Sequence, residues 1–346
     1  MELIPTVKIV NRDGIKAVKN GQKANEFSHI PNTRKPDWIR VKATFDPRYN
    51  KVKEQVVEKR LNTVCEESMC PNISECWSNG TATFMLMGSV CTRACKFCSV
   101  DTGNPKGWLD HDEPQNTAKA VSVMDLKYVV LTSVNRDDLE DGGAKHYADT
   151  VKAIKARNPN TAVEALTPDF KGIFSSIETI VNSGIEVFAQ NMETVERLTH
   201  PVRDIRAGYQ QTLEVLAESK RINPTVLTKT SIILGLGETD SEVVEAMRKI
   251  RSCGVDMITL GQYLQPGGRH IPVERFPEPS QFADWDREAR ERGFSAVASG
   301  PLVRSSYRAG LLWEESTGSE PVVTRESTGS AVSHLTFSRT NGGQTI

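Results

Sequence analysis

Three cysteines follow an apolar run almost directly in Thr83-Phe-Met-Leu-Met-Gly-Ser-Val-Cys91-Thr-Arg-Ala-Cys95-Lys-Phe-Cys98. Residues 84–88 have the length and composition of a buried strand, so we expect the cysteines in the loop at its carboxyl end. The spacing C-x3-C-x2-C lets one short loop direct three thiolates at three corners of an iron–sulfur cubane, which leaves the fourth iron without a protein ligand. A metal site with an unfilled position can bind a substrate or do chemistry, whereas a closed site is usually structural.

Short apolar segments alternate with stretches of helical length from residue 83 onward. The alternation predicts strands at residues 84–88, 128–132, 162–166, 186–189, 228–234, 257–260 and 295–298. It predicts amphipathic helices between them, among them residues 145–155, 208–221 and 241–253. Strands that alternate with helices form a parallel sheet, so we expect an α/β fold. The pattern alone leaves open whether the sheet is wound open or closes towards a barrel.

A second cysteine cluster lies upstream of this strand. Cys65, Cys70 and Cys76 have the spacing C-x4-C-x5-C, and Pro71 bends the chain after the second thiol. The six cysteines can form one large site or two separate ones. Because the apolar run that predicts the strand lies between the clusters, we infer two metal centres with three thiolates each.

Zinc and disulfides are the alternatives for these cysteines. A zinc site normally takes four ligands, and the nearest histidine, His111, lies across the turn Gly103-Asn-Pro-Lys-Gly107 with no paired ligand spacing around it. A disulfide framework needs an oxidising compartment and fits badly with seven cysteines, an odd number, in a chain of 346 residues. An iron–sulfur cluster explains groups of three thiolates better than either.

The loop Cys91-Thr-Arg-Ala-Cys95-Lys-Phe-Cys98 resembles that of the radical S-adenosylmethionine (SAM) superfamily, whose members let the methionine end of the cofactor chelate the open iron. Together with the upstream Cys65-Glu-Glu-Ser-Met-Cys70-Pro-Asn, it closely resembles the lipoyl synthase family. The resemblance covers about residues 30 to 312 and includes Thr132-Ser-Val-Asn-Arg-Asp-Asp-Leu139, Val163-Glu-Ala-Leu-Thr-Pro-Asp-Phe170, Val202-Arg-Asp-Ile-Arg206, Gly261-Gln-Tyr-Leu-Gln-Pro266 and Arg304-Ser-Ser-Tyr307. It implies a partial (β/α)6 TIM-like barrel of the radical SAM type, with an N-terminal extension that carries a cluster.

The resemblance also implies two 4Fe–4S clusters with separate ligands. These ligands are Cys91, Cys95 and Cys98 for the radical-generating cluster, and Cys65, Cys70, Cys76 and Ser306 for an auxiliary cluster. In the family, one electron delivered to the first cluster cleaves SAM and generates a 5′-deoxyadenosyl radical. A serine oxygen is a harder donor than a thiolate and is mismatched to a soft cluster. We therefore hypothesise that Ser306 makes the auxiliary cluster easy to dismantle.

Three polar residues are candidates for contacts with SAM. Asn135 and Asp137 follow the strand expected at residues 128–132, where the superfamily contacts the amino group of the methionine moiety. A charged loop that leads into the next helix is the equally weighted alternative. Glu164 lies inside the apolar segment 162–166, where an unpaired charge is costly. If it faces the lumen of a barrel, the ribose hydroxyls are its natural partner.

Gly235 and Gly237 follow the strand expected at residues 228–234, and backbone can approach a ligand closely at such glycines. In the superfamily, a glycine-rich strand end of this kind often lies beside the adenine. The alternative is a strand-to-helix turn in which Asp240 or Ser241 caps the helix.

Arg203 and Arg206 flank Asp204 and have two possible roles. They clamp a carboxylate bidentately, or they pair with the aspartate on a surface turn. We favour the surface pair.

The family reaction places two sulfur atoms on carbons 6 and 8 of an octanoyl chain in amide linkage to a lysine of a lipoyl carrier domain. Those carbons bear no activating group, so the step falls to a cofactor radical, and sulfur from the auxiliary cluster captures the carbon. The implied partners are octanoylated carrier domains of 2-oxoacid dehydrogenase subunits and the glycine cleavage H protein, a ferredoxin or flavodoxin as electron donor, and an iron–sulfur carrier that rebuilds the auxiliary cluster. The basic stretch 34–42 is a candidate contact for the carrier domain, with a solvated segment as the alternative.

The composition is that of an ordinary soluble globular chain. With 38% hydrophobic residues, 25% charged residues and a net charge of −1, nothing points to nucleic acid. The sequence has neither an apolar stretch of membrane-spanning length nor a secretory signal, so we expect a cytoplasmic protein without a membrane partner. We expect a flexible N-terminal arm at residues 1–30, an extension with the auxiliary cysteines at 31–82, the barrel at 83–312 and a disordered tail rich in Ser, Thr and Gly at 313–346.

Two other functions stay open. A different radical enzyme, which transfers sulfur from an auxiliary cluster to another substrate, shares the C-x3-C-x2-C loop but not the C-x4-C-x5-C motif upstream. A non-catalytic electron-transfer protein with two clusters is the alternative from another class, although ferredoxins normally supply four cysteines to each cluster.

Overall fold

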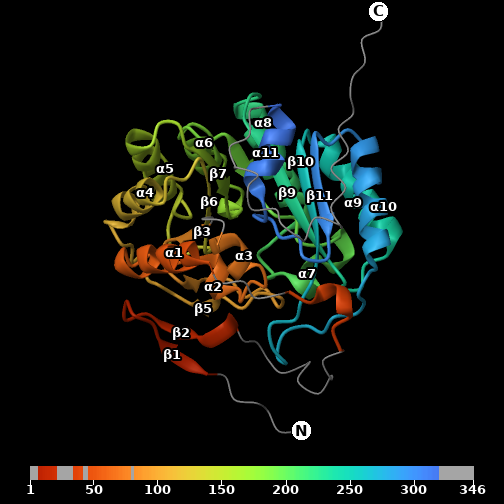
Figure 1. Cartoon of the computed structure of the whole chain (residues 1–346), viewed down its shortest axis with the longest axis horizontal. Helices are drawn as coiled ribbons and strands as arrows, with labels where there is room; N and C mark the ends of the chain where they lie inside the picture. The colour runs from red at the N-terminus through yellow and green to blue at the C-terminus, as the bar shows by residue number, and fades with distance from the viewer. Residues whose placement is uncertain (1–6, 22–33, 42–45, 79–81, 319–346) are drawn as a thin grey trace, which may run out of the picture.

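A parallel sheet of seven strands forms the centre of the computed structural model, which describes residues 7–21, 34–41, 46–78 and 82–318 (Figure 1). Its strands are β3 (Thr83–Leu86), β6 (Tyr128–Ser133), β7 (Ala162–Leu166), β8 (Val187–Ala189), β9 (Leu227–Leu234), β10 (Met257–Gln262) and β11 (Ala296–Gly300). They lie in chain order, β11-β10-β9-β8-β7-β6-β3, and every pair is parallel. The end strands β3 and β11 are not neighbours in this order, so the sheet is a barrel that stays open. The prediction of an α/β partial barrel is confirmed.

Helices connect consecutive strands and cover the outer face of the sheet (Figure 1). They are α4 (Glu113–Val123), α5 (Ala144–Arg157), α6 (Phe174–Val181), α7 (Thr199–Val202), α8 (Tyr209–Ile222), α9 (Asp240–Ser252) and α10 (Pro279–Glu291), with 3-10 turns η3 (Phe170–Gly172) and η4 (Glu196–Leu198). Every residue of β3, β8, β10 and β11 is buried, as expected for a parallel sheet covered on both faces. All seven predicted strands and the three named helices are confirmed, with ends that differ by a few residues.

Helix α11 (Ala309–Thr317) covers the inner, lumen face of the sheet near the amino ends of the strands. Its Ala309 belongs to one buried apolar cluster with Val130 of β6, and its Leu312 belongs to another with Val187 of β8. The ring of Trp313 lies 5.8 Å from that of Tyr128. The helix therefore spans the inside of the open barrel. The prediction that the disordered tail begins at residue 313 is wrong, because these apolar contacts hold the chain as helix to Thr317; residues 319–346 lie outside the described residues.

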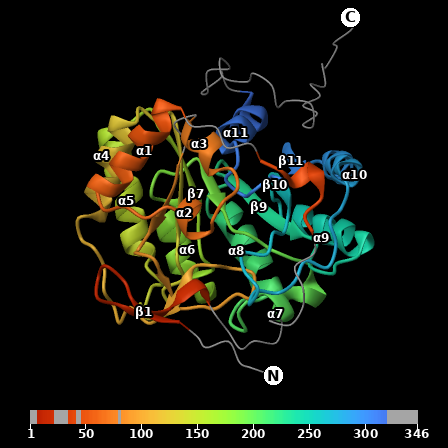
Figure 2. The same ribbon diagram turned by 60° about the horizontal axis from the view of Figure 1, so that its bottom comes forward.

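A hairpin near the N-terminus extends a second, smaller sheet. Its strands are β1 (Lys8–Val10) and β2 (Lys16–Val18), and the sheet continues through β5 (Asp101–Gly103) to β4 (Val90–Cys91), with 3-10 turn η1 (Lys19–Gly21). Both views place β1 at the edge of the molecule away from α11 (Figures 1 and 2). The prediction of a flexible arm at residues 1–30 is wrong for the residues in this hairpin. The sequence did not reveal it, because strands of three residues are too short to show the alternation of apolar and polar residues. Residues 1–6 and 22–30 lie outside the described residues.

Three helices precede the barrel. They are α1 (Pro47–Glu58), α2 (Val64–Glu67) and α3 (Ile73–Ser78), preceded by the 3-10 turn η2 (Asp37–Ile39). Helix α1 buries Val52 and Val56, and the ring of Tyr49 lies 5.2 Å from that of Trp77 in α3. The division into an extension at residues 31–82 and a barrel at 83–312 stays a prediction. Among the described residues, none of the helices combines the length and the apolar character needed to span a membrane.

Candidate functional site

The loop Cys91–Cys98 starts at the end of β4, shortly after the first barrel strand. Burial, together with a smaller contribution from the neighbouring Cys95, raises the pKa of the Cys91 thiol to about 11 and that of Cys98 to about 12. The backbone N–H groups of Arg93 and Asn135 donate to the Cys91 sulfur, the former at 3.4 Å. The three thiols are therefore close enough to interact electrostatically in a buried setting that offers hydrogen bonds to sulfur.

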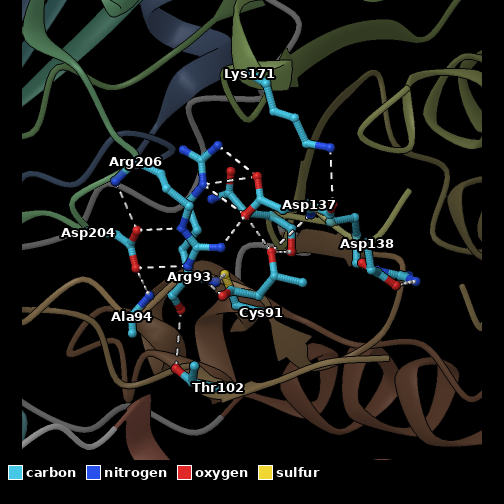
Figure 3. A network of polar contacts seen from close by, with 12 residues as sticks. Cys91, Arg93, Ala94, Thr102, Asp137, Asp138, Lys171, Asp204 and Arg206 are labelled. Carbon is cyan, nitrogen blue, oxygen red and sulfur yellow. Dashed lines mark hydrogen bonds and ion pairs between the residues drawn. The ribbon is translucent and has the colours of Figure 1, made fainter. Parts of the chain in front are cut away.

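A buried arginine fastens this loop to two barrel strands (Figure 3). Arg93 pairs with Asp137, which follows β6, through Nε at 3.0 Å and Nη2 at 2.9 Å. It also pairs bidentately with Asp169, which follows β7, at 2.6 and 2.7 Å. Only 4% of the Arg93 side chain and 2% of the Asp169 side chain are exposed, so the pair lies out of water, where bidentate geometry is most effective.

Asp204 and Arg206 hold the opposite side of the loop. The Asp204 N–H donates to the Cys95 sulfur at 3.3 Å, and its carboxylate accepts from the Ala94 N–H at 2.8 Å and from Arg206 Nε at 2.8 Å. Burial alone would raise the pKa of Asp204, but the bonds from Arg206 and Ala94 hold it well below its ordinary value. The predicted pair of Arg206 with Asp204 is confirmed, and Arg206 is half-exposed, but Asp204 itself is buried against the cysteine loop rather than on the surface. Arg203, also buried, donates instead to the Met192 carbonyl at 3.3 Å.

The upstream group of cysteines, Cys65, Cys70 and Cys76, is built from two short helices. Cys65 lies in α2, Cys76 lies in α3, and Cys70 lies between them. Burial raises the pKa of all three thiols, to about 11 for Cys65, and charge interactions with Cys65 and Cys70 raise that of Cys76 further. The Cys65 sulfur is also bonded by the backbone N–H of Thr83 in β3. The three thiols thus share one buried setting of their own, beside the first barrel strand.

The segment that carries Ser306 lies against this cluster, although more than two hundred residues separate them. Tyr307 donates through its hydroxyl to Glu75 at 2.9 Å, and Arg308 donates to the same carboxylate oxygen at 2.8 Å. The charge of Arg304 lowers the pKa of Cys70, opposing burial. Because its neighbours on both sides face the cluster, Ser306 lies in the right segment for a fourth ligand, and that role stays a prediction.

The thiol arrangement fits iron–sulfur clusters better than the alternatives. All seven cysteines are free, so the disulfide alternative is wrong. Within the described part of the chain, no three or more His, Cys, Asp or Glu side chains are placed to hold a metal ion. A cubane does not need such convergence, because each thiolate binds a different iron around a shared space. That each group holds its own cluster stays a prediction.

The predicted SAM residues Asn135 and Asp137 lie next to the cysteine loop. The Asn135 carbonyl accepts from the N–H of Thr92 at 3.0 Å and from its hydroxyl at 2.9 Å. Asp137 accepts from the Thr92 hydroxyl at 2.7 Å and from Arg206 Nη1 at 3.1 Å. Although burial acts to raise it, the pKa of Asp137 is lowered by bonds from Arg93 and Thr92. Both residues therefore position the loop, and their contact with SAM stays a prediction.

Glu164 lies on the lumen side of β7 and already has partners there. Its neighbours in register, Val130 and Val187, are the residues that pack with α11. Lys229 Nζ lies 2.8 and 2.9 Å from its two oxygens, and the Tyr128 hydroxyl donates to it at 2.7 Å. The charge that burial makes costly is therefore satisfied inside the protein, and the predicted ribose contact stays a prediction.

Gly235 and Gly237 both have positive φ angles, of 96° and 102°. A Cβ at Gly235 would lie 2.3 Å from Gln262 Nε2 and 2.5 Å from the Arg275 carbonyl oxygen, so the turn needs glycine there for contacts within the protein. The predicted adenine contact stays a prediction.

The helix that follows, α9, is capped by Thr239 rather than by Asp240 or Ser241. The Thr239 hydroxyl accepts the Glu242 N–H at 3.3 Å, and the Glu242 carboxylate accepts the Thr239 N–H at 2.8 Å. Thr239 and Glu242 therefore form a reciprocal capping box, which places the cap one or two residues before the predicted positions.

Comparisons with known proteins agree with this geometry. A family model described as the radical SAM superfamily matches residues 85–250. A lipoyl synthase of Legionella pneumophila (strain Paris) is 60% identical over 307 residues, which cover 89% of this chain and 93% of that protein. A lipoyl synthase of Ectopseudomonas mendocina (strain ymp) is 60% identical over 310 residues, covering 89% and 88%. The chain belongs to the lipoyl synthase family.

The lipoyl synthase family belongs to the radical SAM enzymes, so this chain is a sulfurtransferase enzyme whose chemistry uses an iron–sulfur cluster and SAM. A solved structure agrees with the fold. The FeFe-hydrogenase maturase HydG from Carboxydothermus hydrogenoformans superposes with a TM-score of 0.52 at 11% identity, covering 72% of this chain and 64% of that one.

Three residues at the family site were missed by sequence reasoning. Arg93 and Asp169 form the buried pair, and Glu193 follows β8 with a positive φ of 69°. Burial raises the pKa of Glu193, although Arg203 opposes it, and the Glu193 charge raises that of Cys98. The signal was available, because Asp169 and Glu193 lie within four residues of the ends of buried strands, as Asp137 does, and Arg93 is the arginine inside the cysteine loop.

Proposed function

We propose that this chain inserts two sulfur atoms, at carbons 6 and 8, into an octanoyl chain attached to a lysine of a lipoyl carrier domain. One observation carries the proposal: six buried or partly buried cysteines form two groups of three on one open barrel, and the segment around Ser306 lies against the upstream group, Cys65, Cys70 and Cys76. A radical source and a sulfur source are the two parts that the reaction needs.

Each group of residues would hold a 4Fe–4S cluster. Cys91, Cys95 and Cys98 would hold the cluster that binds SAM, and Cys65, Cys70, Cys76 and Ser306 would hold the auxiliary cluster. When bound, these groups supply the radical chemistry and the sulfur that amino-acid side chains lack. The protein supplies position: Arg93 and Asp204 fix the loop at both sides, while Ser306 offers a hard oxygen donor and therefore the weakest hold on its cluster.

The chain also keeps water from the reacting centre. Leu312 and Trp313 of α11 pack across the lumen at the amino ends of the strands. Lys229 neutralises Glu164 within the lumen. An apolar, charge-balanced lumen at the amino ends of the strands would limit the water and free protons that reach a reactive radical.

The partners of the reaction are octanoylated carrier domains of 2-oxoacid dehydrogenase subunits and of the glycine cleavage H protein. A ferredoxin or flavodoxin would deliver electrons, an iron–sulfur carrier would rebuild the auxiliary cluster, and the reducing cytoplasm would suit all three. Residues 34–41 of the basic stretch are mostly exposed, with Trp38 39% exposed and Arg40 paired to Asp37 at 2.8 Å. This surface is open to a carrier domain; Lys42 lies outside the described residues.

The test is a reaction with defined components. Anaerobically reconstituted protein is mixed with dithionite, SAM and an octanoyl-lysine peptide, and 5′-deoxyadenosine and a dithiolane product are measured by mass spectrometry. We expect both. Failure to cleave SAM would contradict any radical enzyme, including one that acts on another substrate, and would favour electron transfer. Cleavage without sulfur gain would favour a different radical enzyme.

Two neighbouring serines give a matched pair of variants for the auxiliary ligand. We expect Ser306→Ala to retain SAM cleavage but to lose most insertion of the second sulfur, because the auxiliary cluster then lacks its fourth donor. Ser305→Ala is the control and should behave like the unchanged protein. Equal product yields from both variants would remove Ser306 from the mechanism.

A further inference from the structure

Asp204 contacts the middle of the radical cysteine loop in two ways. Its backbone N–H donates to the Cys95 sulfur at 3.3 Å. Its carboxylate Oδ2 accepts the Ala94 N–H at 2.8 Å (Figure 3). The Cys95 sulfur therefore receives a hydrogen bond from a residue 109 positions later in the chain. Hydrogen bonds to cluster sulfurs and nearby charges both set the potential of an iron–sulfur centre.

Arg206 completes the contact from the same turn. Its Nε donates to Asp204 Oδ1 at 2.8 Å, its Nη2 donates to the Thr92 carbonyl at 2.8 Å, and its Nη1 lies 3.1 Å from Asp137 Oδ2. The Arg206 guanidinium therefore neutralises Asp204. It also ties Asp204 and the cysteine loop to Asp137, which lies after β6.

The backbone of the turn adds one more bond, because the Lys96 N–H donates to the Val202 carbonyl at 2.8 Å. Residues 202–206 thus contact the loop at residues 92, 94, 95 and 96, and we name this turn the 202–206 clasp. Such a run of contacts fixes the direction in which the Cys95 sulfur points. It also places one negative and one positive side chain on the backbone of the loop that carries that sulfur.

We propose that Asp204 and Arg206 are positioning residues that orient the Cys95 thiolate and balance the charge beside the cluster of Cys91, Cys95 and Cys98, and so set its reduction potential. The inference rests on the proposed function, since it concerns the cluster which that function assigns to these cysteines. Neither residue needs to contact SAM or the substrate for this role.

Opposite charges give the inference a distinctive test. Asp204→Asn removes one negative charge from the clasp while Arg206 keeps its pair with Asp137, so the net charge near the cluster becomes more positive and the cluster should be reduced at a higher potential. Arg206→Gln leaves Asp204 uncompensated and should shift the potential to a lower value. A residue pair that merely keeps the loop folded would shift the potential in one direction, or not at all, when either member is removed.

The measurement is an EPR-monitored redox titration of the anaerobically reconstituted full chain with both clusters. SAM identifies the relevant signal, because only the cluster that binds it changes its spectrum on SAM addition. The Asp204→Asn/Arg206→Gln double variant should return close to the starting potential, and Arg206→Lys, which keeps the charge, should stay near it. Circular dichroism melting shows whether each variant is folded.

Glu245→Gln and Arg248→Gln provide the control, since these residues form a bidentate pair of the same kind on the exposed face of α9. Neither control should shift the potential. Shifts of the same sign from both clasp variants, or no shift from either, overturn the inference. If both single variants lose the cluster, the double variant decides: a restored signal supports the inference and a missing one overturns it. A starting protein without any SAM-responsive cluster would instead contradict the proposed function.

Discussion

The two cysteine regions are held in different ways. The loop 91–98 is clamped by charged side chains that are almost fully buried, such as Arg93 and Asp169, with 4% and 2% of their side chains exposed. The segment 65–76 consists of short helices fixed to a distant segment by a more open pair, Arg308 and Glu75, with 23% and 32% exposed. Breaking a buried ion pair is strongly destabilising, because it leaves an unpaired charge in the protein interior. Exposed ion pairs contribute little to stability. The difference suits one centre that persists and another that is consumed.

The largest expected effect comes from removing one thiolate from each region. Cys95→Ala should reduce 5′-deoxyadenosine to background, because the loop then offers only two ligands to the cluster that binds SAM. Cys70→Ala should keep SAM cleavage measurable and reduce the dithiolane product to background. Mass spectrometry of both products makes the measurement. Loss of SAM cleavage in both variants would contradict a division of labour between the regions.

A smaller effect is expected on stability. Arg93→Gln leaves two carboxylates, Asp137 and Asp169, without their buried partner and should lower the free energy of unfolding by about 3–5 kcal/mol. Arg308→Gln, the matched change in the other region, should cost about 1 kcal/mol, since its pair with Glu75 is partly exposed. Anaerobic urea unfolding measures both. Similar losses of unfolding free energy for the two variants would contradict the difference between the two regions.

The barrel that carries the loop 91–98 contains a second buried ion pair, formed by Glu164 and Lys229. Lys229→Met leaves the Glu164 carboxylate buried without its partner and should cost about 3–5 kcal/mol, while Glu164→Gln/Lys229→Met should recover most of that loss. The KM for SAM in Glu164→Gln separates this role from the predicted ribose contact. An unchanged KM is expected if the internal pair is the role of Glu164, and a KM raised tenfold or more would favour the ribose.

A local effect is expected at the bond that ties the auxiliary segment to the residues after β11. Asn72, which is buried, donates to the Leu302 carbonyl at 2.7 Å. Asn72→Ala should lower the free energy of unfolding by about 1–2 kcal/mol and should speed the loss of iron from the auxiliary site to a chelator. The SAM-responsive EPR signal should not change. Equal loss of iron from both centres would show that the bond does not act on the auxiliary segment alone.

The sequence was sufficient for the barrel because its strands are apolar and regularly spaced. Each predicted strand is found, and in strands such as 128–132 burial on both faces produces a nearly continuous apolar run that needs no further signal. The hairpin of β1 and β2 was missed, because three-residue strands rich in lysine depend on pairing with β5 rather than on their own pattern. Helix α11 extends beyond the predicted boundary, because the packing of Trp313 on Tyr128 is a tertiary contact that composition cannot reveal.

The sequence located the two groups of cysteines but not the residues that hold them in place, and the role of these cysteines as cluster ligands stays a prediction. The cysteine spacing alone located both groups of thiols. The role of Asp204 was not predictable, because its contact with Cys95 spans 109 positions, and an Arg-Asp-Ile-Arg sequence is equally typical of a surface turn. Glu164 shows the reverse case: its odd position in an apolar strand signalled importance, but only the structure shows Lys229 beside it.

A single-turnover iron measurement tests the central claim, that one cluster persists while the other is consumed. Reconstituted protein should start with about eight irons per chain, and one turnover with the octanoyl-lysine peptide should leave about four, with the SAM-responsive EPR signal intact. Product formation without loss of iron, or loss of the SAM-responsive signal in place of the other, would contradict the account.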